Sequence, residues 1–111
     1  MAVNSHIVIK FEYNAMHHWP GEPAGSLYNL MAPHQHFFLI TLHIPVKDLD
    51  REIEFIEFRD EFIEKVDMTY LGDFGARSCE MIATELMALS EIATKVEVFE
   101  NEYVGAIVER S

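Results

Sequence analysis

The sequence contains a single cysteine, Cys79, and only eight lysine and arginine residues against nineteen aspartates and glutamates. A lone cysteine can form neither an intramolecular disulfide nor a cysteine-based zinc cluster, so metal chemistry would depend on histidines and carboxylates. The formal net charge of −11 repels phosphate backbones and anionic membrane surfaces. We therefore expect no nucleic-acid binding and no membrane binding.

Long apolar runs are also absent from the sequence. A membrane-spanning helix needs about 20 apolar residues, and a signal peptide needs a basic stretch followed by an apolar core. We therefore expect a cytoplasmic protein. The chain has 111 residues, of which 50% are hydrophobic, and this length and composition suit one domain over residues 1–111 with its own core.

Hydrophobic alternation predicts two strands in the first half of the chain. Within residues 6–18, apolar side chains occupy alternate positions, which is typical of a half-buried strand: Ile7, Ile9, Phe11 and Tyr13. Residues 34–45 are apolar at nearly every position and predict a central strand that is buried on both faces. Between them, two prolines and two glycines within residues 19–26 predict a long loop that extends to Pro33.

The second half of the chain predicts two helices and a hairpin. Residues 48–67 begin with strand-like alternation and continue with helical spacing, which indicates a short extended piece passing into a helix. Ser78 is a suitable N-cap for a second helix, whose apolar stripe comprises Cys79, Ile82, Leu86, Leu89 and Ala93. Alternation over residues 95–99 and 103–109 predicts a closing hairpin. The expected fold is α+β in the order ββααββ, a four-stranded antiparallel sheet with two helices on one face.

Histidine spacing predicts a metal site. His34 and His36 are two residues apart in an expected strand and therefore point to one face, whereas His43 has the opposite parity. Antiparallel pairing with the first strand brings either His17 or His18 beside them. Three imidazoles and one open position form a ligand set typical of catalytic zinc. The alternative is a group of strand-end histidines that bind no metal.

Several sequence blocks, taken in order, resemble one enzyme family. They are residues 15–21 (AMHHWPG), 34–36 (HQH), 53–58 (IEFIEF), 78–83 (SCEMIA) and 96–100 (VEVFE). The blocks resemble the 6-pyruvoyl- and 6-carboxytetrahydropterin synthases, which share the tunnelling fold, and the resemblance covers nearly the whole chain. It implies that His17, His34 and His36 hold Zn²⁺, and that the protein is a homohexamer of stacked trimers.

The resemblance also implies roles for three further residues. Glu100 matches the glutamate that anchors a pterin through two hydrogen bonds, whereas the pattern alone favours a solvated turn residue. Ser78 matches a threonine that could contact the ligand, and its position as an N-cap already explains it. Asp67 matches the catalytic aspartate of a proton relay. The implied activity is that of a zinc-dependent lyase, similar to 6-carboxytetrahydropterin synthase on the route to deazaguanine compounds such as queuosine.

Two departures from the family pattern bear on this chemistry. Leu30 stands where family members carry a catalytic cysteine, and Met68 stands where they carry the histidine of the relay. Each positioned acid or base contributes about 10²–10⁴-fold to the rate, so the lyase reaction should be impaired. Gln35 also replaces the central glycine of the family's His-Gly-His motif, which could alter access to the metal.

Three functions therefore stay open at this point. The first is a zinc-dependent synthase that acts on or binds a reduced pterin or deazapurine precursor. The second is a non-catalytic pterin- or purine-binding or assembly protein that keeps the fold and the metal. The third is different chemistry on the same ligand, with another base in place of the missing groups. Three residues could approach the metal: Cys79, Glu22 and His18. The helical stripe assigns Cys79 to the core.

Overall fold

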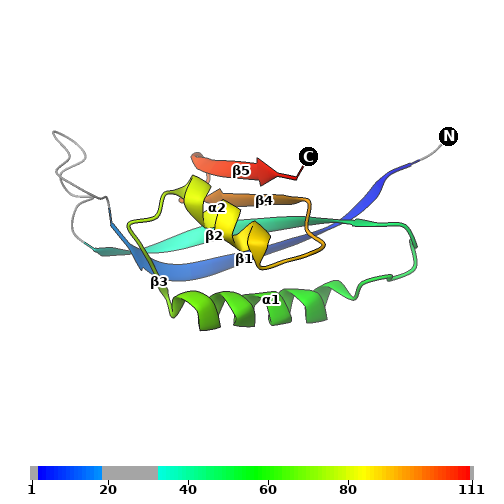
Figure 1. The fold of residues 1–111 in the computed structure, drawn as a ribbon, viewed down its shortest axis with the longest axis horizontal. Coiled ribbons are helices and arrows are strands. Elements are labelled where there is room, and N and C mark those ends of the chain that lie inside the picture. Colours follow the sequence, from blue (N-terminus) through cyan, green and yellow to red (C-terminus); the bar gives the residue numbers. More distant parts are fainter. Residues whose placement is uncertain (1–2, 19–32, 111) are drawn as a thin grey trace.

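The computed structural model describes residues 3–18 and 33–110, and within these ranges the chain forms five strands and two helices (Figure 1). The elements in order are β1 (Ser5–His17), β2 (His34–Val46), α1 (Phe55–Tyr70), β3 (Asp73–Gly75), α2 (Cys79–Ala88), β4 (Lys95–Phe99) and β5 (Gly105–Glu109). The predicted α+β class is confirmed. The predicted loop lies outside the described residues, except for Pro33.

Strands β1 and β2 form a long antiparallel hairpin that extends beyond the shorter strands β4 and β5 (Figure 1). Ser5 pairs with Val46 at one end, and His17 pairs with His34 at the other. The predicted burial of this second strand on both faces is wrong for its first half. There the even-numbered side chains face the core, whereas Phe37 on the opposite face is 62% exposed.

The sheet is five-stranded and mixed, in the order β3-β1-β2-β4-β5, and not four-stranded and antiparallel as predicted. The additional strand β3 runs parallel to the end of β1. Gly72 and Gly75 adopt φ angles of 75° and 59°, which favour glycine, and they turn the chain alongside β1. The backbone N–H of Met16 donates to the Gly72 carbonyl at 2.8 Å, and that of His18 donates to the Gly75 carbonyl at 2.9 Å. A strand of three residues is too short to show alternation in the sequence.

Both helices pack on the core face of the sheet. Phe62 of α1 meets Phe11 of β1 edge-on, with ring centroids 6.2 Å apart. Ile82 and Leu86 of α2 are fully buried in the same cluster as Val96 of β4. Neither helix in these ranges has the length and hydrophobicity needed to cross a membrane.

The boundaries of both helices differ from the prediction. Residues 47–54 form turns and bends in place of the expected extended piece. The Glu52 carboxylate explains this, because it accepts hydrogen bonds from the backbone N–H groups of Lys47 and Asp48 and folds the segment back. Helix α1 then begins after Glu54, whose side chain caps it.

Helix α2 ends at Ala88, so Ala93 is not on its stripe as predicted, although it is fully buried. The guanidinium of Arg110 donates hydrogen bonds to carbonyl groups in the last turn of the helix and after it: those of Met87, Ser90, Glu91 and Ala93. A cation at this end also complements the helix dipole. Arg110 therefore stabilises the end of α2 beside β5.

Candidate metal centre

Three histidines meet at one end of the β1–β2 hairpin, as the spacing predicted. His17 pairs directly with His34, and His36 is opposite Ala15, so all three side chains lie on the core face. Ring centroids are 4.3 Å apart for His17 and His34, 5.3 Å for His17 and His36, and 6.1 Å for His34 and His36. One ring nitrogen from each lies within 4.8 Å of the others. The sequence allowed either His17 or His18, and the structure selects His17.

His17 is the most buried member of this group, with 8% of its surface exposed. Its Nε2 atom is buried and forms no hydrogen bond within the described part of the chain. Burial, together with the neighbouring His34, His36 and His18, lowers the pKa of His17 to about 4. The ring is therefore neutral near pH 7. A buried polar atom without a partner is destabilising, and a bound metal ion would give this nitrogen one.

His36 is held by the backbone that follows β4. Its Nε2 atom forms a short hydrogen bond with the carbonyl oxygen of Glu100. A carbonyl oxygen can only accept, so the neutral His36 ring carries its proton on Nε2 and keeps its lone pair on Nδ1. Hydrogen bonds of this kind orient metal-binding histidines and fix their tautomer.

A cavity of about 440 Å³ opens beside the histidines. Its walls come from three parts of the chain: the open end of the hairpin, the residues that lead into α2, and the segment between β4 and β5. The polar residues that line it are His17, His18, His34, His36, Arg77, Ser78, Glu80 and Glu100. This volume is adequate for a small organic molecule.

The histidine group fits a transition-metal ion. Neutral imidazole is a good ligand for zinc, copper, nickel and iron. In a tetrahedral zinc site the nitrogens lie about 3.3 Å apart, so small side-chain rotations would complete the set from the observed spacing. The cavity leaves one side of the group accessible to a further ligand. These residues could therefore hold a metal ion with a free coordination position.

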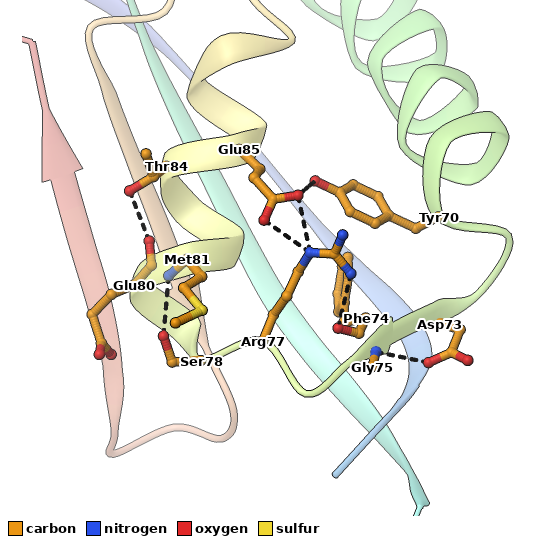
Figure 2. Close-up of polar contacts among 10 residues, drawn as sticks. All are labelled: Tyr70, Asp73, Phe74, Gly75, Arg77, Ser78, Glu80, Met81, Thr84 and Glu85. Atoms are coloured by element: carbon orange, nitrogen blue, oxygen red, sulfur yellow. Dashed lines mark hydrogen bonds and ion pairs between the residues drawn. The ribbon is translucent and has the colours of Figure 1, made fainter. Parts of the chain in front are cut away.

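Ser78 and Glu100 both line this cavity. The Ser78 hydroxyl accepts a 3.2 Å hydrogen bond from the backbone N–H of Met81, which confirms its predicted role as the N-cap of α2 (Figure 2). Its contact with a ligand stays a prediction. Glu100 contributes its carbonyl group to His36, and its carboxylate lies close enough to Cys79 to act on it electrostatically. A ligand in the cavity could reach this carboxylate.

Cys79 lies at the start of α2 and is buried. Burial, together with the negative charges of Glu100 and Glu80, raises the pKa of its thiol to about 12. The thiol is therefore protonated at neutral pH and is a poor base or nucleophile. This supports the structural role that the helical stripe indicated.

Asp67 lies on α1, outside the residues that line the cavity. It is exposed, and its carboxylate accepts a hydrogen bond from Tyr13. Met68 beside it is 73% exposed. The predicted catalytic role of Asp67 stays a prediction, because this single chain does not bring it to the histidines. Leu30 and Glu22 lie outside the described residues.

Arg77 was missed in the sequence analysis. It lines the histidine cavity and contacts Tyr70, Phe74 and Glu85 (Figure 2). The only signal in the sequence is that it directly precedes the N-cap Ser78, a position that is often close to a ligand bound at a helix N-terminus. Pairing of Arg77 with Glu85, eight residues further along, could not be read from a helical or strand period.

Comparison with known proteins does not place the chain in a family. Neither the available protein-family models nor the curated proteins include a match to it.

Proposed function

We propose that the protein is a zinc-binding relative of 6-carboxytetrahydropterin synthase that takes a reduced pterin or deazapurine precursor into the histidine cavity. The observation that carries the proposal is the group of His17, His34 and His36, in which a nine-tenths buried imidazole nitrogen has no partner within the described residues. The order of sequence blocks supports the ligand class.

Each part of the site would have a distinct task in this function. Zinc held by the three histidines would supply a Lewis acid. The Glu100 carboxylate could accept two hydrogen bonds from the ring N–H and the exocyclic amine of a pterin, a pairing that rejects analogues without these donors. Its backbone carbonyl would at the same time keep His36 in one orientation.

A second candidate function is a non-catalytic binding or assembly protein. Two observations favour it: the Cys79 thiol is held in its protonated form, and Asp67 is directed to Tyr13. Neither is a suitable base for the cavity in this chain. Such a protein would keep the metal and the ligand and would lack turnover.

Binding and turnover measured on one preparation distinguish these functions. We expect the zinc-loaded protein to bind a reduced pterin, with turnover of dihydroneopterin triphosphate at least about 10²–10⁴-fold below that of an intact family member. Glu100→Gln keeps the side-chain shape and removes the charge, so it should weaken pterin binding while zinc stays bound. Unchanged pterin affinity in Glu100→Gln would show that Glu100 does not anchor the pterin. Robust turnover of the unmodified protein would exclude the non-catalytic function.

We also propose that the protein assembles into a homohexamer, in which neighbouring chains continue the sheet. Two edges support this. Strand β3 pairs with β1 only near Met16 and His17, so the rest of β1 has no strand on that side in the described ranges. Strand β5 forms the other edge of the sheet. Exposed edges of this kind commonly pair with another chain.

A further inference from the structure

The turn between β4 and β5, residues 100–104, is closed by the side chain of Asn101. Its Oδ1 atom accepts hydrogen bonds from the backbone N–H groups of Tyr103, at 2.7 Å, and Val104, at 3.1 Å. Asparagine side chains commonly close turns in this way. The backbone N–H of Glu100 also donates to the Val104 carbonyl at 3.0 Å. Asn101 therefore fixes the path of the chain directly after Glu100.

The far end of this turn is constrained by Gly105, the first residue of β5. A side chain at this position would place its Cβ atom 2.5 Å from the Val98 carbonyl oxygen and 2.6 Å from the Phe99 Cα atom. Both distances are far below ordinary van der Waals contact, so the chain leaves the turn along a path that only glycine allows. The turn is thus held by Asn101 within it and by the close approach of β5 to β4 at its end.

The turn sets the position of the Glu100 carbonyl group. Pairing between β2 and β4 ends at Leu39 and Phe99, one residue before Glu100. Beyond that point the Glu100 carbonyl oxygen accepts a hydrogen bond from Nε2 of His36, at the start of β2. Because no strand pairing holds Glu100 against β2, this contact depends on the turn.

The contact decides which nitrogen of His36 keeps its lone pair. A neutral imidazole has one N–H group and one lone pair, and a metal ion binds the nitrogen that has the lone pair. The Glu100 carbonyl holds the proton on Nε2, which leaves the lone pair on Nδ1. Without this acceptor the ring would exchange between its two tautomers, and a smaller fraction would present Nδ1 to a metal.

We propose that Asn101 is a positioning residue of the metal centre: by closing the turn it holds the Glu100 carbonyl against His36 and thereby selects Nδ1 of His36 as the metal-binding nitrogen. Asn101 is exposed, does not line the histidine cavity and acts through Glu100. This inference rests on the proposed function for the identity of His36 as a metal ligand. It adds a residue of the β4–β5 turn to those on which the site depends.

The test reads the tautomer of His36 by long-range ¹H–¹⁵N correlation NMR of the full chain, metal-free, at about pH 8.5, where histidine rings are ordinarily neutral. The signals that disappear in His36→Ala identify this ring. In the unmodified protein we expect the proton on Nε2. Asn101→Ala removes the acceptor that closes the turn, so it should give a mixture of both tautomers.

Zinc affinity, measured by competition with a zinc-binding dye, should fall about 10-fold in Asn101→Ala, because groups that orient metal-binding histidines contribute to affinity on this scale. Asn101→Asp keeps an acceptor oxygen at the same position. This variant should retain both the Nε2 proton of His36 and the zinc affinity of the unmodified protein.

The matched control is Asp48→Ala. The Asp48 carboxylate accepts a 2.9 Å hydrogen bond from the backbone N–H of Asp50 in an exposed turn after β2, and Asp48 does not line the histidine cavity. Its loss removes the same kind of contact and should change neither the tautomer of His36 nor the zinc affinity.

Three outcomes would overturn the inference. The first is an Nδ1 proton on His36 in the unmodified protein, which needs no variant to detect. The second is an Asn101→Ala protein that matches Asp48→Ala in tautomer and zinc affinity. The third is an Asn101→Asp protein that behaves like Asn101→Ala. Failure of the unmodified protein to bind zinc would instead count against the proposed function, while the metal-free spectra would still test Asn101.

Discussion

The hydroxyl of Tyr13 donates a 2.8 Å hydrogen bond to the carboxylate of Asp67, and it accepts a 3.0 Å hydrogen bond from the backbone N–H of Gly72. Burial raises the pKa of Tyr13, and the hydrogen bond to Asp67 adds to this, so the phenol remains a neutral donor. One side chain of β1 thus connects α1 to the turn that leads into β3. Because β3 flanks His17, this connection contributes to the position of a proposed metal ligand.

Replacement of Tyr13 by phenylalanine should lower the free energy of unfolding by about 1–3 kcal/mol, since it leaves the Gly72 N–H and the Asp67 carboxylate without their partner. Urea denaturation monitored by circular dichroism gives this value. Tyr103→Phe is the control, because Tyr103 is 85% exposed and should change stability by less than about 0.5 kcal/mol. Similar stability of the two variants would show that the Tyr13 hydroxyl contributes little.

Protein purified without chelators should contain about one zinc ion per chain. Alanine at His34 or His36 should reduce the zinc affinity at least about 100-fold, because one of three proposed ligands is removed. Competition with a zinc-binding dye measures the affinity, and elemental analysis gives the stoichiometry.

The matched control for these variants is His43→Ala. His43 lies on the other face of β2, where its Nε2 atom is 2.6 Å from the Glu97 carboxylate. Its loss should leave the zinc content unchanged. The proposed metal centre would be wrong if His34→Ala and His36→Ala retained as much zinc as His43→Ala.

Cys79 should react slowly with thiol reagents in the folded protein. A rise of the thiol pKa from 9.0 to about 12 lowers the thiolate fraction at pH 8 about 1000-fold. Burial of the sulfur slows the reaction further. The rate of iodoacetamide modification, followed by mass spectrometry in buffer and in denaturing urea, measures the difference. If the modification rate in the folded state were close to the rate in urea, Cys79 would be a candidate base.

Sedimentation should show a species of about six times the 12.8 kDa chain mass. Ile107 lies on the edge strand β5 and is 48% exposed, so Ile107→Lys should shift the protein to smaller species. Met68→Lys places the same charge on the exposed surface of α1 and should leave the mass unchanged. A 13 kDa monomer at micromolar concentration for the unmodified protein would contradict assembly.

Hydrophobic periodicity predicted those helices and strands in which each face keeps the same burial along its length. The alternation within residues 6–18 and the cap at Ser78 are local features, and strand β1 (Ser5–His17) and the cap are found within one residue of where they were expected. Strand β3 was missed because its pairing with β1 depends on Gly72 and on a partner more than fifty residues away. The histidine group was predictable because antiparallel register follows from a hairpin. The place of Arg77 was not, because it is set by contacts with three separate elements.

The three histidines all come from the β1–β2 hairpin, whereas Arg77, Ser78 and Glu100 come from the second half of the chain. The two halves of the site can therefore diverge separately in evolution. Substitutions around α2 and after β4 could change which molecule is accepted while the hairpin keeps its three histidines. A lineage with this architecture can acquire a new specificity without first losing its histidine group.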